Sequence, residues 1–151
     1  MKANRTFLAG VVLATAAVSL VPGRAAEPDS KSVYYALPDK IEWRKGEASD
    51  TANLVGDSSK PGLYIQLIRW HPGHMSRPHF HSMERYITVL SGTWWVGTTT
   101  KYDPPSTYPF PAGSYVVDKA NGIHYDGAKD ADCVIEIVGM GPVSTTQAEQ
   151  K

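Results

Sequence analysis

The sequence has a single cysteine, Cys133, among its 151 residues, so an internal disulfide is excluded. Cys133 lies in the apolar run 133–138, where we expect a small buried hydrophobic side chain, with a catalytic thiol as the alternative. An excess of one charge is also lacking, because 15 lysines and arginines balance 15 aspartates and glutamates without forming a basic stripe. This balance argues against nucleic acid as a partner.

Helical periodicity is scarce as well. Beyond residue 26, no segment keeps a helical hydrophobic period for three turns, whereas 13 glycines and 11 prolines separate short runs of β-branched and aromatic residues. We expect strands at residues 32–37, 40–45, 62–70, 78–81, 85–91, 93–98, 114–118, 122–126 and 133–138. With no internal repeat, this pattern predicts one all-β domain over residues 30–142, either a sandwich or a barrel, followed by a flexible polar tail over 143–151.

The N-terminal residues differ in kind from the rest. Lys2 and Arg5 precede an apolar run at residues 7–21, and small residues follow it. This order predicts a secretory signal peptide over residues 1–25, cut after Ala25 or Ala26, and a mature protein in the periplasm or outside the cell. A retained membrane anchor is the alternative, but the run is short for a membrane-spanning helix. Cleavage would leave 12 basic against 15 acidic residues and no membrane association.

Two histidines stand one residue apart in the stretch RPHFHSMERY, residues 77–86. In a strand, side chains two residues apart share a face, so His79 and His81 would aim at one point. Neutral imidazoles bind borderline divalent metals. The stretch therefore predicts part of a metal site.

The residues from Gly73 to Gly92 resemble the first signature of the cupin superfamily. That signature is a glycine, five residues, a His-x-His pair, a short spacer, a glutamate, six residues and a second glycine. A later stretch, GSYVVDKANGIH, resembles the second signature, whose first glycine and histidine fall on Gly113 and His124. The resemblance implies that His124 joins the histidine pair in the metal site.

The second signature is imperfect, because Lys119 stands where proline is usual and Asn121 stands where glycine is usual. Asparagine tolerates the left-handed backbone conformation better than most residues, so we expect the turn to survive. The resemblance covers about residues 60–142, including the spacing between the signatures. It implies an all-β fold, a single cupin-type β-barrel (jelly roll), similar to a group of small exported bacterial cupins.

The first signature also lacks its glutamate. Arg85 occupies that position, and Glu84 stands one residue early, on the opposite face by strand parity unless a β-bulge turns it inward. We therefore expect a three-histidine shell of His79, His81 and His124 for a divalent transition metal: copper, zinc, iron or manganese. Without the carboxylate the preference shifts from manganese towards copper or zinc. The alternative is a barrel that has lost its metal.

For the polar residues near the first signature, two roles each are open. An inward Arg85 could clamp a substrate carboxylate or phosphate, or it could pair with an acid such as Glu84 or Asp126. His71 and His74 could form a second metal site or a proton relay, or they could be exposed turn residues. His74 is the better candidate to approach the pocket.

Two adjacent tryptophans, Trp94 and Trp95, should point to opposite sides of their strand. The inward one could form a wall for an aromatic or carbohydrate ring. The alternative for either ring is packing in the core or at a dimer interface.

Together these features predict an exported metal-binding cupin. The interpretation is a mononuclear metalloenzyme that performs oxygen-dependent or redox chemistry on a small organic or sugar-like substrate, with Glu84 or His74 moving protons. A non-catalytic metal or ligand binder and a metal-assisted isomerase or lyase are the alternatives. We expect a homodimer.

Overall fold

The computed structural model describes residues 25–150. The chain divides after Tyr34 into two units, and the second, which begins at Tyr35, holds every strand of the described residues. All but the last residue of the predicted signal peptide, residues 1–25, lies outside the described residues. Within the described part of the chain, no helix is long and apolar enough to cross a membrane.

Ten strands and two short 3₁₀ helices make up the second unit. The strands are β1 (Ser49–Val55), β2 (Gly62–Trp70), β3 (His79–His81), β4 (Arg85–Ser91), β5 (Thr93–Gly97), β6 (Tyr108–Pro111), β7 (Tyr115–Asp118), β8 (Tyr125–Gly127), β9 (Cys133–Gly141) and β10 (Thr145–Gln147). The helices are η1 (Pro38–Lys40) and η2 (Pro104–Ser106). The all-β fold predicted from the sequence is confirmed.

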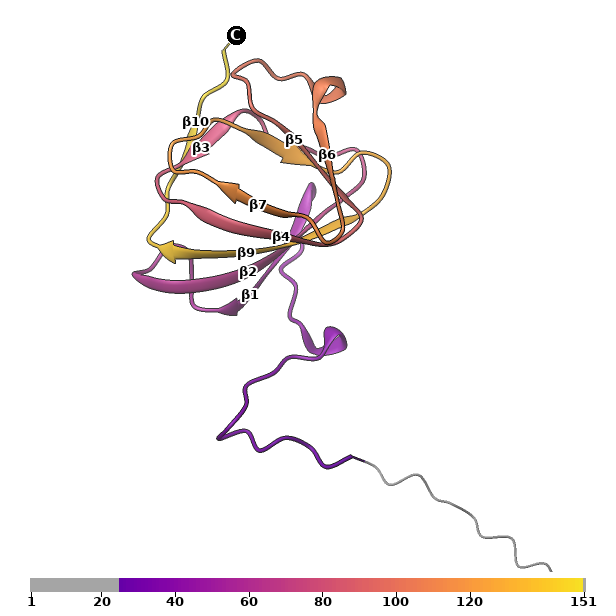
Figure 1. Cartoon of the computed structure of the whole chain (residues 1–151), viewed down its shortest axis with the longest axis vertical. Coiled ribbons are helices and arrows are strands. Elements are labelled where there is room, and N and C mark those ends of the chain that lie inside the picture. The colour runs from indigo at the N-terminus through magenta and orange to yellow at the C-terminus, as the bar shows by residue number, and fades with distance from the viewer. Residues whose placement is uncertain (1–24, 151) are drawn as a thin grey trace, which may run out of the picture. The chain divides into compact units, whose positions relative to one another are not determined.

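The strands form two facing layers (Figure 1). One layer is an antiparallel sheet in the order β1-β2-β9-β4-β7, and the other contains the pair β10-β3 and the triplet β6-β5-β8. Two isolated bridges, Met75–Gly127 and His79–His124, join the pair to the triplet. At the second bridge the N–H of His79 donates to the carbonyl of His124 at 2.8 Å, and the reverse bond measures 2.9 Å. The second layer is thus continuous in the order β10-β3-β8-β5-β6, as in a jelly roll.

The core lies between the two layers. Alternate residues of β4 and β9 point inward, so Ile87, Val89, Ile135 and Ile137 are all almost fully buried. Trp94 closes the core from β5 with 2% of its surface exposed. Trp95, the next residue, points the other way and packs under the ammonium group of Lys129, as strand parity predicts.

Several expected strands differ from the structure. Residues 32–37 form no strand, and residues 40–45 contribute only an isolated bridge. The sequence analysis did not predict β1, β6 and β10, because these segments are polar or rich in proline. β1 and β6 lie at the edges of their sheets, where half-exposed side chains and missing N–H donors are tolerated.

The sequence predicts a flexible polar tail over residues 143–151, and three of the described residues in it form a strand. Thr145–Gln147 forms β10 and pairs with β3. Beyond it, the side chain of Glu149 accepts two hydrogen bonds from Arg77. Polar side chains do not prevent this pairing, because strand ladders are made by the backbone.

Cys133 is fully buried at the start of β9, as the sequence predicts, and burial raises the pKa of its thiol to about 12. Because the thiolate is the reactive form, we expect a thiol reagent to label the native protein far more slowly than protein unfolded in guanidinium. Equal labelling rates in the two states would show that the side chain is accessible.

Candidate metal centre

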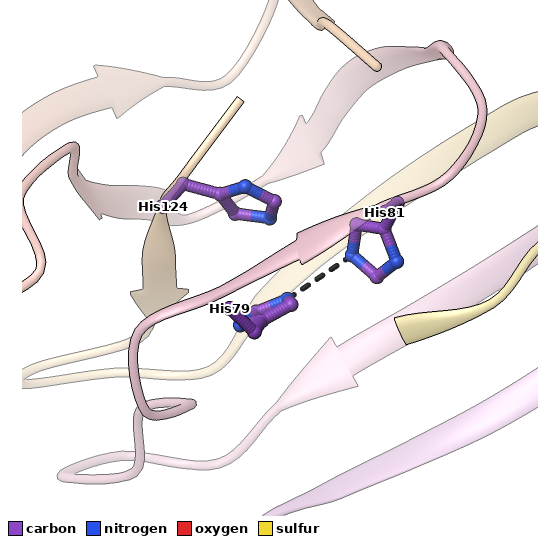
Figure 2. Close-up of side chains that lie close together, drawn as sticks. All are labelled: His79, His81 and His124. Atoms are coloured by element: carbon purple, nitrogen blue, oxygen red, sulfur yellow. Dashed lines mark hydrogen bonds between the residues drawn. The ribbon is translucent and has the colours of Figure 1, made fainter. Parts of the chain in front are cut away.

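Three histidines meet inside the barrel. His79 and His81 lie on β3 and His124 lies just ahead of β8, so that their imidazoles come together (Figure 2). One nitrogen from each ring lies within 4.8 Å of the others, and the three residues are 7%, 6% and 5% exposed. Among the described residues this is the only group of three or more potential ligands. These are the three histidines that the sequence analysis grouped, and the group could hold a metal ion.

Hydrogen bonds at Nδ1 orient each ring. Nδ1 of His79 lies 2.7 Å from the carbonyl oxygen of Arg77, and Nδ1 of His124 lies 3.0 Å from that of Gly122. Because a carbonyl only accepts, Nδ1 of His79 and Nδ1 of His124 carry the proton, and the Nε2 atom of each ring keeps an unprotonated lone pair. Nδ1 of His81 lies 3.0 Å from the hydroxyl of Thr145 on β10. Partners of this kind fix the orientation of metal-binding histidines.

The distance between the Nε2 atoms also fits a shared ion. Those of His79 and His81 are 3.0 Å apart, along the dashed line in Figure 2. Two nitrogens bound to one ion at about 2.0–2.1 Å lie roughly 3 Å apart. Without an ion the two rings share a hydrogen bond across this distance, and a bound cation would replace the shared proton.

Burial also favours the ligating form of the rings. Desolvation lowers the pKa of His79, and it lowers the pKa of His81 to about 3, with the positive charge of Arg85 as the next contribution. Both rings are therefore neutral at neutral pH, which is the state that binds a metal.

The turn before His124 depends on Asn121. This residue adopts a positive φ of 62°, and its N–H donates to the carbonyl of His81 at 2.8 Å. Asparagine thus replaces the glycine of the cupin signature as expected, and it ties the two signatures together beside the centre.

Arg85 points towards the centre, and Glu84 does not. The guanidinium of Arg85 donates through Nε at 2.8 Å and through Nη2 to Asp118, and Nη2 lies 3.4 Å from Nε2 of His124. The partner acid is therefore Asp118, not Glu84 or Asp126. Glu84 is exposed and accepts a hydrogen bond from the hydroxyl of Tyr86 at 2.7 Å.

Strand parity predicts the orientation of this segment only in part. It places Arg85 inward and Glu84 outward correctly, but Met83, which the same parity assigns to the face of His81, is 42% exposed. The reason is that β3 ends at His81 and β4 begins at Arg85, so the residues between them leave the strand geometry. No bulge turns a carboxylate of this segment inward, and the ligand group stays at three histidines.

His71 and His74 lie away from the centre. Nδ1 of His71 is 2.9 Å from the carbonyl of Glu47, and its Nε2 is 3.1 Å from the buried carboxylate of Asp50. Nδ1 of His74 is 3.0 Å from the carbonyl of Pro72. Neither residue lines the inner cavity described next.

Asp126 is a buried acid beside the centre. The sequence analysis named it only as a partner for Arg85. It is 6% exposed, and its carboxylate accepts hydrogen bonds from the hydroxyl of Ser76 at 2.8 Å and from the indole N–H of Trp94 at 2.9 Å. With His79, His81 and Arg85, it lines an inner cavity of about 230 Å³. The signal was available: Asp126 follows His124 by two residues, so it shares the inward face of that segment.

Comparisons with known proteins agree with this fold. No family model and no curated protein matches the sequence. Among solved structures, the polyketide cyclase RemF from Streptomyces resistomycificus superposes with a TM-score of 0.65 at 14% identity, covering 79% of this chain and 87% of that one. A sugar phosphate isomerase of the cupin superfamily from Silicibacter pomeroyi gives a TM-score of 0.57 at 18% identity, covering 74% and 80%.

A protein with a double-stranded β-helix domain from Klebsiella pneumoniae is also similar, with a TM-score of 0.58 at 14% identity over 78% of this chain and 97% of that one. At such identities the likeness shows the fold alone. The chain therefore has the cupin fold, a double-stranded β-helix. The three histidines inside its barrel could hold a metal ion.

The hydroxyl of Thr145 gives a test of the C-terminal strand. Replacing Thr145 with valine keeps the shape but removes the hydrogen bond to Nδ1 of His81. We expect zinc affinity to fall about 10-fold, because partners of metal-binding histidines contribute about 10–100-fold. Competition with a chromophoric chelator measures this change.

Thr146 provides the matched control, since it is exposed on the same strand and pairs with Phe80. Thr146→Val should leave zinc affinity unchanged. Equal affinities for both variants and the wild type would show that β10 does not support the centre.

Proposed function

We propose that this protein is an exported metal-binding cupin with a mononuclear centre on His79, His81 and His124. The observation that carries the proposal is the convergence of three buried rings, two of whose Nδ1 atoms donate to backbone carbonyls and so leave Nε2 for an ion. Three protein ligands would leave coordination positions open, as in catalytic rather than structural sites.

The proposal extends to an enzyme that performs oxygen-dependent or redox chemistry on a small organic or sugar-like substrate. A bound copper, zinc, iron or manganese ion supplies a Lewis acid or a redox centre there. The chain's own contribution is an inner cavity beside the three buried histidines and a cationic side chain, Arg85, that is already oriented by Asp118. Glu84 and His74 lie outside the inner cavity, so the proposal gives proton transfer to Asp126, whose carboxylate lines it.

A second candidate is a metal-assisted isomerase or lyase that needs no oxygen. The similar structures support it, because they include a polyketide cyclase and a sugar phosphate isomerase as well as an oxalate decarboxylase. A cupin fold by itself does not choose among such reactions. A non-catalytic metal or ligand binder remains the third alternative.

Elemental analysis of protein purified from its native compartment tests the centre. We expect about one transition-metal ion per chain, and a metal-free protein that fails to take up any of the four candidate ions would overturn the proposal. Oxygen uptake by the loaded protein with candidate substrates would favour the redox enzyme. Turnover that continues without oxygen would favour the isomerase or lyase.

Export and dimer formation are also parts of the proposal. The N-terminal pattern favours export, and exposed apolar side chains on β4 and β7 (Tyr86, Tyr115 and Val117) offer a surface for a second copy. N-terminal sequencing that finds Met1 on exported protein would contradict cleavage. A monomer mass by light scattering would contradict the dimer.

A further inference from the structure

A second and larger cavity adjoins the metal centre. Its volume is about 720 Å³, within the roughly 300–1,000 Å³ typical of small-molecule sites, and residues of β5, β6, β7 and the segment entering β8 line it. Asp118 and His124 belong to its lining, while Arg85 and the other two histidines line the inner cavity. The large cavity therefore reaches the edge of the centre at His124.

Apolar and aromatic side chains form the wall of this cavity, notably Trp94, Val96, Phe110 and Val116. The rings of Trp94 and Phe110 lie 6.1 Å apart, centroid to centroid. Such a wall suits a flat apolar body, which gains from ring contacts as well as from leaving water.

Hydrogen bonds hold the wall in place without a ligand. The indole N–H of Trp94 donates to the carboxylate of Asp126 at 2.9 Å. The hydroxyl of Tyr125 donates to the carbonyl of Asp103 at 3.0 Å and ties the loop after β5 to β8. A cavity preformed in this way loses little conformational entropy when it binds a ligand.

The charged residues of the lining favour an anion. Lys101 and Lys119 are exposed at the cavity, and neither forms an ion pair with any residue in the described range. The negative charge of Asp118 is already offset by Arg85. Asp103, the other acid of the lining, accepts a hydrogen bond from Ser106. The two unpaired ammonium groups are thus available to an anionic ligand.

We propose that this cavity binds a small amphipathic anion, with an aromatic or similarly flat apolar body against Trp94 and Phe110 and a carboxylate near Lys101 and Lys119. That such a ligand is the substrate rests on the proposed function, because the metal centre would meet it at His124. Its binding in the cavity does not require the ion.

Calorimetric titration of the metal-free protein with 2-naphthoate tests the proposal, with 2-naphthalenemethanol as the uncharged probe. We expect wild type to bind the naphthoate about 10-fold more tightly than the alcohol. Replacing both Lys101 and Lys119 with glutamine should remove that difference. No binding of either probe, or a preference that survives in the double variant, would overturn the proposal.

Filling the cavity locates the probe. Val116→Trp should weaken naphthoate binding at least about 10-fold, and Thr98→Trp should do so from an exposed position of the lining where the core is undisturbed. Leu90→Trp is the control, because this exposed residue of β4 lies outside the lining. Unchanged binding in Thr98→Trp, or an equal loss in Leu90→Trp, would place the probe elsewhere and overturn the proposal.

Zinc affinity measured on the same preparations separates this proposal from the proposed function. Protein that binds zinc but not naphthoate would overturn only the ligand class. Protein that binds naphthoate with the expected preference but takes up no metal would support the cavity as a ligand site and overturn the metal centre.

Discussion

Replacing any one of His79, His81 and His124 with alanine is expected to lower zinc affinity by more than about 100-fold. The loss of affinity on removal of a ligand should exceed the roughly 10–100-fold loss that follows removal of a ligand's hydrogen-bond partner. Among residues 25–150 these three histidines form the only group of three or more potential ligands. Chelator competition gives the affinity, and the visible spectrum of the cobalt-loaded protein reports the ligand set independently.

Two control variants make this result specific. His71→Ala should bind zinc as wild type does, because His71 contacts Glu47 and Asp50 and not the centre. Glu84→Gln should also retain affinity, since its carboxylate accepts from Tyr86 at the surface. Undiminished binding in both His79→Ala and His124→Ala would refute the centre. A large loss in Glu84→Gln would instead mean that this carboxylate turns inward and completes a three-histidine, one-glutamate shell.

Acidification is expected to destabilise the metal-free protein steeply. Burial holds the pKa of His81 at about 3 in the folded protein, and it lowers the pKa of His79 as well. The unfolded chain has ordinary histidines with a pKa near 6.5. Between about pH 6.5 and about pH 3 the unfolded state therefore binds more protons, so the free energy of unfolding falls as pH falls. Above about pH 6.5 this contribution to stability is fully present.

The size of the effect follows from the shift at His81. At about pH 4.5, two units below the reference pKa of histidine, protonation of His81 in the unfolded chain makes the free energy of unfolding roughly 2–3 kcal/mol lower than at neutral pH. Urea titrations at several pH values measure the decline. His81→Gln removes the titrating ring and should flatten the curve over this range, whatever its stability at neutral pH. An identical pH dependence in the variant and in wild type would contradict the origin at His81.

Bound zinc should oppose this loss of stability at neutral pH and cease to do so in acid. An ion that binds only the folded state stabilises it by mass action, and protonation of the ligands weakens that binding. Because the pKa values of His79 and His81 are lowered, the protection should persist to a lower pH than ordinary histidines would allow. Urea titrations with and without zinc measure this range.

Local rules account for the parts of the site that lie within one strand. The two-residue period of an extended chain was enough to place His79 and His81 on one face, and the same period would have placed Asp126 beside His124. Strand length and turn composition were enough for an all-β domain, and the likeness to the cupin signatures chose the barrel over the sandwich. The likeness to the cupin signatures added His124, which no rule of spacing within a strand could have brought to β3.

Only the tertiary structure decided the contacts between segments that are far apart in the chain. Arg85 pairs with Asp118 because β4 and β7 are neighbours in register, and Thr145 reaches His81 because the C-terminal segment adds a strand to β3. Pairing of this kind is made by backbone groups that every residue carries, so a polar tail gives little sign of it. Side-chain pattern thus determined the faces and the fold class, whereas the closure of the barrel determined which charges and hydroxyls surround the histidines.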